Sequence, residues 1–453
     1  MNNGMPPLAA EKRGGRKPAA FVLGIGLAAN SFEYRPPIGR RKNEVDMKHI
    51  TGGVTAAKGF EAAGAEAQVK YQNRKDMAMV FSRTPCRAAG VFTSNVVKAA
   101  PVVWDREIVE NASAVHAVVV NSGIANACTG EQGREYCRQT AFAAAEALGI
   151  PETSVLVAST GVIGMQLPMD RITAGVKALA GTLSDTVDAG REAAEAIMTT
   201  DTHSKQVAVT IELSGKTVTI GGMAKGSGMI HPNMCTMLGF VTTDAAISKE
   251  LLQEALRADV VDTFNMISVD GDTSTNDTLL VLANGCAGNE EITEKNEDYR
   301  TFCEALHEVN MTLAKMLAGD GEGATALFEC RVIHADTKEN ARTLAKSVIC
   351  SSLTKAAIFG HDANWGRILC ALGYSGVRFD PEAIELFIES KAGRILIYQS
   401  GSAADYSEEE ATRILSCPAV TALVDMKMGE EEATAWGCDL SYDYVKINAD
   451  YRS

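Results

Sequence analysis

Residues 225–244 constrain this chain most, because a glycine-rich turn there leads into an apolar run that starts at a hydroxyl. Gly226 and Gly228 permit positive φ and close approach of the backbone. Pro232 fixes its own φ and biases the residue before it away from helix. The apolar residues after Thr236 are typical of a strand. We therefore expect Thr236 at the junction between an exposed loop and a buried strand.

A threonine in that position has two interpretations. In the first, a buried strand follows a tight turn and the hydroxyl has no chemical role. In the second, Thr236 attacks the carbonyl of Cys235, the chain breaks, and Thr236 becomes a new N-terminus. Its free α-amine then acts as the base for its own hydroxyl, as in N-terminal threonine nucleophiles. Spacing alone favours the structural interpretation.

The composition is that of a soluble globular protein, with 46% hydrophobic and 22% charged residues among 453. This length allows two or three ordinary domains or one large α/β unit. The net charge of -14, with no basic stripe to offset it, argues against a nucleic-acid partner. No apolar run is long enough to span a bilayer, so we expect no membrane partner either.

The cysteines indicate reduced thiols and not a disulfide framework or a zinc site. There are 11 of them, an odd number, and none forms a C-x-x-C pair. We therefore expect a cytoplasmic protein. Asp270, Asp272 and Ser274 imitate a calcium loop. However, Thr275 replaces the required Gly, and Val281 stands where the terminal Glu should be. We expect instead a turn held by side-chain hydrogen bonds, and no metal.

Residues 1–46 form a separate segment. Basic residues precede the apolar run 19–29, which superficially resembles a signal peptide. Gly24 and Gly26 imitate a dinucleotide fingerprint, but no βαβ unit follows. The segment is an upstream extension before a true start at Met47, an organelle-targeting peptide or a secretion signal. We favour the first, an extension that is disordered or not native.

Helices and strands alternate in both halves of the chain, which predicts a layered α/β architecture. Alternating apolar residues on both sides of Ser214-Gly215 predict a hairpin over 206–220. A second hairpin is predicted over 433–447, and a helix capped by Asp170 follows residue 169. Further strands are predicted at 76–81, 115–121, 155–158, 278–282, 327–334, 394–398 and 419–426, and helices at 136–148, 192–198, 249–259, 299–317 and 337–349.

Several motifs resemble one known family. Residues 225–238 resemble the self-cleavage motif KGSGMIxPNMATML of the ornithine acetyltransferases, the glutamate N-acetyltransferases of arginine biosynthesis. Cys235 replaces the usual Ala of that motif. The likeness continues, in the family's order, through NSG (121–123), ANACTG (125–130), STGVIG (159–164), MTTDT (198–202), DGDTSTND (270–277), DGEGAT (320–325) and NWGR (364–367). An ordered set of blocks is far more specific than any one of them.

The resemblance implies a layered α-β-β-α sandwich related to the N-terminal-nucleophile hydrolases. It implies self-cleavage into an alpha subunit of residues 47–235 and a beta subunit of residues 236–453. The two subunits would stay associated, as a heterotetramer of two alpha and two beta chains. The implied reaction moves acetyl from N2-acetylornithine to glutamate through acetyl-Thr236, without a metal or cofactor. Some family members also use acetyl-CoA as donor, and the sequence leaves that point open.

The resemblance also implies site residues. Thr236 would be the nucleophile, with Thr160 and Gly161 stabilising the oxyanion. The substrate-binding residues would be Thr199, Lys225, Thr236, Glu322, Asn448 and Ser453, where Ser453 replaces the family's Thr and keeps the hydroxyl. Without the resemblance, each has an ordinary structural explanation, such as a helix-end hydroxyl, a solvated lysine, a capping acid or a frayed tail.

Two other functions stay open at the level of sequence. One is an amidohydrolase or aminopeptidase on the same scaffold, in which water replaces glutamate as the acceptor. The docking residues Glu322, Asn448 and Ser453 argue for a second amino acid instead. The other is an uncleaved binding protein without activity, and the joint presence of Thr236 and Lys225 with the Thr160-Gly161 pair argues against it.

Overall fold

The computed structural model describes residues 45–231 and 237–450. Residues 45 onward form one compact unit. The predicted extension 1–46 falls almost entirely outside the described residues. Cys235, Thr236 and Ser453 also lie outside them.

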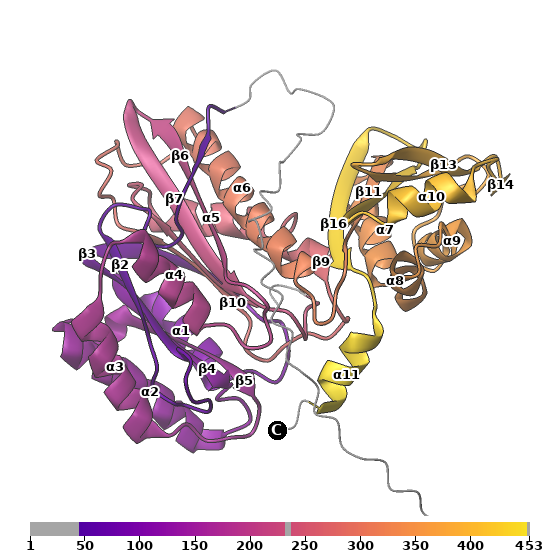
Figure 1. Cartoon of the computed structure of the whole chain (residues 1–453). Coiled ribbons are helices and arrows are strands. Elements are labelled where there is room, and N and C mark those ends of the chain that lie inside the picture. The colour runs from indigo at the N-terminus through magenta and orange to yellow at the C-terminus, as the bar shows by residue number, and fades with distance from the viewer. Residues whose placement is uncertain (1–44, 232–236, 451–453) are drawn as a thin grey trace, which may run out of the picture. The chain divides into compact units, whose positions relative to one another are not determined.

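The described residues contain strands and helices in alternation, as predicted (Figure 1). The strands are β1 (Lys48–Ile50), β2 (Phe60–Ala65), β3 (Met77–Phe92), β4 (Val115–Ile124), β5 (Val155–Val162), β6 (Lys205–Leu213), β7 (Lys216–Lys225), β8 (Leu238–Thr243), β9 (Ile267–Ser268), β10 (Thr278–Ala283), β11 (Leu327–Ala335), β12 (Glu385–Ser390), β13 (Gly393–Gln399), β14 (Ser402–Ala403), β15 (Ala419–Asp425) and β16 (Glu431–Cys438). The helices are α1 (Ala100–Asn111), α2 (Gly130–Leu148), α3 (Met169–Thr182), α4 (Val187–Ala196), α5 (Lys249–Asp259), α6 (Glu297–Gly319), α7 (Lys338–Cys350), α8 (Ser352–Phe359), α9 (Trp365–Gly373), α10 (Glu408–Leu415) and α11 (Tyr442–Asp450).

The long strand β3 links two parts of one large sheet. Its first half pairs with β2 and β4, and its second half pairs with β10. The pairing with β4 shifts register between Phe81 and Cys86. Among the described residues the strand order is β1-β6-β7-β8-β10-β3-β4-β5, with β2 also paired to β3.

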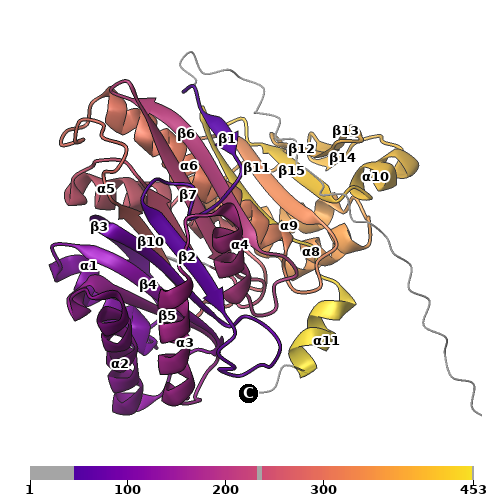
Figure 2. The same ribbon diagram turned by 60° about the vertical axis from the view of Figure 1, so that its left-hand side comes forward.

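These two parts of the sheet pack face to face. Val80, Val120 and Leu156 from one part share a buried cluster with Phe240 and Leu280 from the other. Because successive side chains of a strand point to opposite faces, the next residues along each strand face outward. On one outer side they pack on α2 and α3 (Figure 2), and on the other on α5 and α6. The expected α-β-β-α sandwich is confirmed.

A second sheet follows in the chain, with the order β14-β13-β12-β15-β11-β16-β9 among the described residues. Helix α7 packs on β11 and β16, and α6 contacts both β6 of the first sheet and β16 of the second. The apolar core therefore continues from the sandwich through α6, as Val309 and Leu313 share a cluster with Phe328 and Leu344.

The predicted elements are confirmed where the apolar period is regular. β6 and β7 form the expected hairpin around Ser214-Gly215. Helix α2 ends at Gly149, which has a φ of 68°. Helix α5 has the predicted ends, and Thr337, one of two expected caps, caps α7.

Two predictions were wrong. Asp170 does not cap α3, because Pro168 occupies the cap position and Asp170 lies in the first turn. The hairpin predicted over 433–447 does not form. Only its first part is a strand, β16, and the chain then turns into α11. Helices α1, α8, α9 and α10 had not been predicted.

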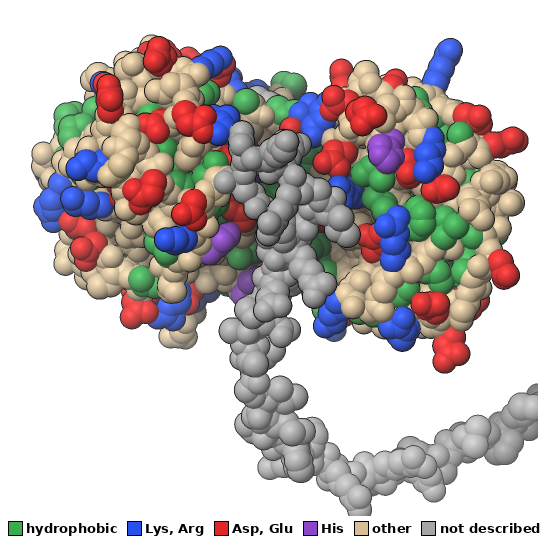
Figure 3. All heavy atoms as spheres, turned by 90° about the horizontal axis from the view of Figure 1, so that it is seen from above, with side chains coloured by type: hydrophobic (Ala, Val, Ile, Leu, Met, Phe, Trp, Pro, Cys, Tyr) green, Lys and Arg blue, Asp and Glu red, His purple; other side chains and the backbone are tan. Residues whose placement is uncertain are grey.

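Charge is distributed over the surface. On the face drawn in Figure 3, described Lys and Arg side chains stand among Asp and Glu side chains and do not gather in a stripe. Among the described residues, no helix is both long and apolar enough to cross a membrane.

Candidate active site

One pocket brings together the described residues that the resemblance had singled out. Its lining includes Thr160 and Gly161 of β5, Thr199 after α4, Lys225 of β7, Glu322 after α6 and Asn448 of α11. Met237, which directly follows Thr236 in the chain, lines it as well. Thr236, Cys235 and Ser453 lie outside the described residues.

Lys225 connects the two threonines of the pocket. Its ammonium donates to Thr199 Oγ1 at 3.0 Å and to Thr160 Oγ1 at 3.2 Å. The side chain is 8% exposed. Burial lowers the pKa of Lys225, while the nearby carboxylate of Asp201 opposes that shift. The sequence alone had suggested a solvated loop lysine, so the buried position supports a role in the site.

The end of β5 is shaped by two glycines. β4 and β5 run parallel, and Gly161 lies opposite Gly123. Gly161 has a φ of +127°, and a Cβ there would lie 2.3 Å from the backbone carbon of Gly123. Only glycine fits such a close approach of two backbones. The strand end can therefore present the Thr160 hydroxyl and the Gly161 backbone together at the pocket.

A buried ion network supports the floor of the pocket, and sequence reasoning missed it. The ammonium of Lys205, 0% exposed, lies 2.7 Å from Asp201 Oδ1 and 2.6 Å from Asp320 Oδ2. The Asp201 carboxylate also accepts the N–H of Gly226 at 2.7 Å and of Thr199 at 3.0 Å. Burial opposes ionisation of Asp201, yet the charges of Lys225 and Lys205 hold its pKa below the usual range.

The Lys205 signal was present in the sequence. Lys205 begins the alternating run Val207, Val209, Ile211 and Leu213, and so shares their buried face. A lysine on the apolar face of a strand is rarely buried without a carboxylate partner. The partners themselves lie at residues 201 and 320, and no spacing rule connects them.

Glu322 is held against the turn that begins at Gly226. Its N–H donates to the Ser227 carbonyl at 2.9 Å, and Ser227 Oγ donates to the Asp320 carbonyl at 2.6 Å. A Cβ at Gly228 would lie 2.4 Å from the Glu322 carboxyl group, so glycine leaves room for it. Asn448 Nδ2 donates to Glu322 Oε2 at 2.7 Å.

Asp270 holds the same turn from the other side. Its carboxylate accepts the N–H of Met229 at 2.6 Å and of Ile230 at 2.8 Å. It also accepts the N–H of Asp272 at 3.3 Å and the hydroxyl of Tyr444 on α11 at 3.3 Å. The expected turn held by side-chain hydrogen bonds is confirmed.

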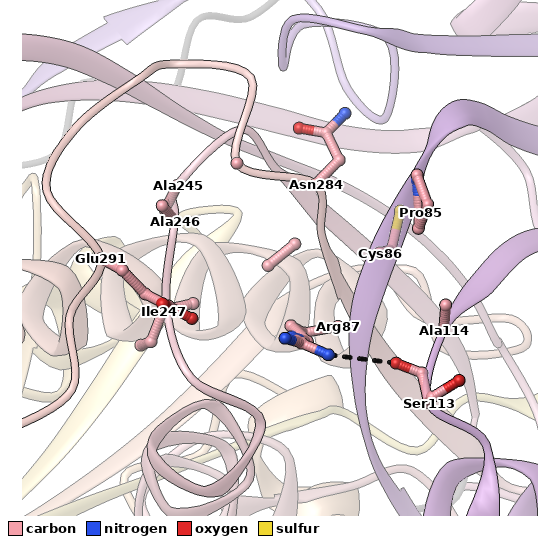
Figure 4. A pocket seen from close by; sticks show the side chains of 12 residues that line it. Pro85, Cys86, Arg87, Ser113, Ala114, Ala245, Ala246, Ile247, Asn284 and Glu291 are labelled. Atoms are coloured by element: carbon pink, nitrogen blue, oxygen red, sulfur yellow. Dashed lines mark hydrogen bonds between the residues drawn. The ribbon is translucent and has the colours of Figure 1, made fainter.

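A second pocket shares no lining residue with the first (Figure 4). It lies between the middle of β3, the start of β4 and the loops around Ala246 and Asn284. Arg87 NH1 donates there to the Ser113 carbonyl at 3.2 Å. None of the described residues that the resemblance had singled out lines it.

The fold and the first pocket together define an enzyme suited to acyl transfer, because hydroxyl and ammonium donors converge beside a carboxylate in one pocket. Comparison with known proteins identifies the family. The chain belongs to the ArgJ family, whose family model matches residues 61–453. This confirms the resemblance seen in the sequence motifs.

Close relatives match over almost their whole length. The chain is 56% identical over 409 residues to the arginine biosynthesis bifunctional protein ArgJ of Symbiobacterium thermophilum, covering 90% of this chain and 100% of that protein. It is 51% identical over 398 residues to the protein of that name from Thermotoga neapolitana, covering 87% and 99%. Among solved structures, it is similar to an ornithine acetyltransferase from Mycobacterium tuberculosis complexed with ornithine, with 44% identity, a TM-score of 0.39, and coverage of 41% of this chain and 98% of that one.

Proposed function

We propose that this chain is an acetyltransferase of arginine biosynthesis, which moves acetyl from N2-acetylornithine to the α-amine of glutamate. Its products are ornithine and N-acetylglutamate. The observation that carries the proposal is the pocket itself, in which five separate segments of an ArgJ-family chain bring together Thr160, Thr199, Lys225, Glu322 and Asn448. The relatives are named bifunctional, which is consistent with a second activity, and for that activity we propose acetyl-CoA as the donor.

The reaction passes through a covalent intermediate on Thr236. The hydroxyl attacks the acetyl carbonyl, the free α-amine of Thr236, with a pKa of about 8, takes the proton, and the tetrahedral intermediate expels ornithine. Glutamate then attacks acetyl-Thr236 in the reverse sense. The Thr160 hydroxyl and the Gly161 N–H donate to the oxyanion of both intermediates. The charge of Lys225, 3.2 Å from the Thr160 hydroxyl, strengthens that donor.

The other pocket residues orient the substrates. The carboxylate of Glu322 receives their amino groups, and its contact with Asn448 fixes its direction. Asn448 and Ser453 bind the carboxylate end, and Thr199 lines the side of the site near Lys225. The buried network around Lys205 keeps the Thr199 and Glu322 segments in place.

The nucleophile is released by maturation. Thr236 attacks the carbonyl of Cys235, which yields subunits of residues 47–235 and 236–453. The two subunits stay together in a heterotetramer of two alpha and two beta chains, and the enzyme is cytoplasmic.

Two measurements test this proposal. Denaturing electrophoresis and intact mass should show two chains for the wild type and one for Thr236→Ala. Initial-rate kinetics should be ping-pong, and acetylornithine alone should release ornithine up to one equivalent per site. Full cleavage of Thr236→Ala would refute a self-catalysed cut. Intersecting rate plots without the partial reaction would refute the acetyl-enzyme.

A further inference from the structure

Self-cleavage needs a proton carrier that the mature enzyme does not need. Before the cut, the nitrogen of Thr236 belongs to an amide, and an amide nitrogen is not a base. It must also gain a proton to leave as an amine. The α-amine that serves acetyl transfer is therefore missing at this step, so another group close to the scissile bond has to handle the proton.

Asp277 is a buried acidic residue that lines this pocket. It is 2% exposed and lines the pocket together with Thr160 and Lys225. Its Oδ2 has no hydrogen-bond partner among the described residues. Buried polar atoms are almost always paired, and exceptions call for an explanation.

The fold places Asp277 beside Met237, the residue that follows Thr236 in the chain. β10 and β8 run parallel, with Thr278 opposite Leu238. The N–H of Thr278 donates to the Met237 carbonyl at 2.9 Å. The N–H of Met237 lies close enough to the Asp277 carboxyl group to lower its pKa. That N–H belongs to the peptide bond between Thr236 and Met237.

The backbone around Asp277 is fixed by its neighbours. Asn276 Nδ2 donates to the carbonyls of Ala125 at 2.6 Å and Ser159 at 2.7 Å, and so ties this segment to the strand end that carries Thr160. The N–H of Thr93 donates to the Asp277 carbonyl at 3.0 Å. Such a position suits a group that acts on one defined bond.

The surroundings favour the protonated form of Asp277. Burial raises the pKa of the Asp277 carboxyl group well above its usual value. Hydrogen bonds with Ser274 and Thr93 and the charge of Lys225 oppose this shift only in part. The carboxylate of Glu322 also lines the pocket, and a second negative charge there favours the neutral form of Asp277.

We propose that Asp277 is the proton donor of self-cleavage. The inference rests on the proposed function, since it concerns the cut before Thr236. The Thr236 hydroxyl oxygen bonds to the Cys235 carbonyl carbon, and the bond from that carbon to the Thr236 nitrogen breaks. Asp277 gives its proton to the nitrogen, and the hydroxyl proton returns to Asp277. Water then hydrolyses the resulting ester to the Cys235 carboxylate and the free Thr236 hydroxyl.

The test follows cleavage of the full-length chain after a short pulse of cell-free synthesis, by denaturing electrophoresis. Asp277→Asn keeps the shape but cannot give up a proton, so its cleavage should slow by at least about 10²-fold. Asp277→Glu should restore part of the rate. Wild-type cleavage should slow as pH rises, since the neutral fraction of the Asp277 carboxyl group then falls.

Asp105 provides a matched control. It is also a fully buried carboxyl group with a raised pKa, and one of its oxygens has no hydrogen-bond partner in the described part of the chain. Its other oxygen accepts the N–H of Val157 at 2.7 Å. It does not line the pocket. Asp105→Asn should therefore leave the cleavage rate within a factor of about 3 of wild type.

The outcomes separate this inference from the proposed function. An uncut wild type would refute the maturation step itself. A wild type that is cut, with Asp277→Asn cut at the same rate, would overturn only the role of Asp277. Asp277→Asn could also stay uncut because it is destabilised, which a melting temperature below that of Thr236→Ala would indicate. In that case Asp277→Glu distinguishes loss of the proton donor from loss of stability. A pH profile of Asp277→Glu displaced from wild type supports the role, and an unchanged profile overturns it.

Discussion

At position 161, the fold and the proposed chemistry both require glycine. A Cβ at this position would meet the Gly123 backbone at 2.3 Å, and the φ of +127° is unfavourable for any other residue. Gly161→Ala should therefore shift the strand end and misdirect the backbone N–H. We expect kcat to fall by about 10²-fold or more, the loss typical of a removed oxyanion donor.

Gly215 is the control for this change. It has a φ of +71° in the β6–β7 turn, and a Cβ there would meet nothing within 4 Å. Gly215→Ala should lower the free energy of unfolding by about 1–3 kcal/mol through backbone strain alone, with kcat unchanged. Steady-state kinetics and urea unfolding of both variants check this. Equal kcat values for the two variants would show that Gly161 does not contribute to the oxyanion site.

Individual site residues were accessible to sequence reasoning only through family resemblance. Thr160, Thr199 and Glu322 carry common structural explanations, and only the three-dimensional fold joins them in one pocket. Lys205 was the exception, because its place on an apolar strand face signals a buried charge pair. Asp277 gave no such signal. In the sequence, the Asn276-Asp277 pair before a strand is typical of an ordinary turn. Only the parallel pairing of β8 and β10 shows that it lies beside Met237.

Among the elements, β6, α4 and α6 depend on one another through Lys205. Its ammonium binds Asp201 after α4 and Asp320 at the end of α6, and it is 0% exposed. Lys205→Met leaves two buried carboxylates without that partner. We expect the free energy of unfolding to fall by about 3–5 kcal/mol, the loss typical of a broken buried pair.

The matched control is an exposed pair. Lys295 contacts Glu254, and the two side chains are 58% and 52% exposed. Lys295→Met should change the free energy of unfolding by no more than about 0.5–1 kcal/mol. Denaturant unfolding at fixed salt measures both. A loss for Lys205→Met as small as that for Lys295→Met would show that the buried network contributes little.

Acid should weaken the same network. Burial raises and the two lysines lower the pKa of Asp201, with the net result below its usual value of about 3.9. The unfolded chain therefore takes up the proton first as pH falls. The stabilisation by Asp201 is complete above the unfolded pKa and is lost as pH falls towards the folded one. Asp201→Asn should show a shallower loss of stability below about pH 4 than wild type, measured by urea unfolding across that range. An identical slope would contradict the assignment.

Regular elements were predictable and α11 was not, for a physical reason. The hairpin of β6 and β7 can be predicted because every second residue along it lies on one buried face. Helix α11 buries no residue, so its sequence carries no apolar period of either kind. Its aromatic and β-branched residues favour a strand. The contrary signal was Ser441 before the helix and Asp443 in its first turn.

Helix α11 now supplies the physical basis for a prediction about the tail. It is anchored by the Tyr444 contact with Asp270 and holds Asn448 on Glu322, so the C-terminal part of this helix lies at the pocket. Deleting Arg452 and Ser453 should raise KM for acetylornithine or glutamate by about 5- to 150-fold, as expected for lost polar contacts of about 1–3 kcal/mol. Self-cleavage should proceed normally. Unchanged KM values for both substrates would show that Ser453 is not part of the site.

At the scale of the whole molecule, the proposed cut divides the chain within its sheet and not between domains. β7 and β3 belong to residues 47–235, whereas β8 and β10 belong to residues 236–453. In the sheet, β8 and β10 lie side by side between β7 and β3. The two products are thus interleaved, with Phe240 and Leu280 of one packed in the same cluster as Val80 and Leu156 of the other.

This interleaving predicts that the two chains of the cleaved protein cannot separate without unfolding. Both edges of the β8–β10 pair are hydrogen-bonded to strands of the other chain. β8 pairs with β7, from Thr243 opposite Ile220 to Leu238 opposite Lys225. β10 pairs with β3, from Thr278 opposite Phe92 to Ala283 opposite Arg87. Apolar packing is not screened by salt, so about 1 M salt, which shortens the Debye length to about 3 Å, should leave them together. The cleaved protein should elute from size exclusion in that salt as one species containing both chains, at the volume of uncut Thr236→Ala. It should also unfold in a single thermal transition, with chain separation only above it. Elution of a free folded chain below that transition would mean that the two products are not held through the shared sheet.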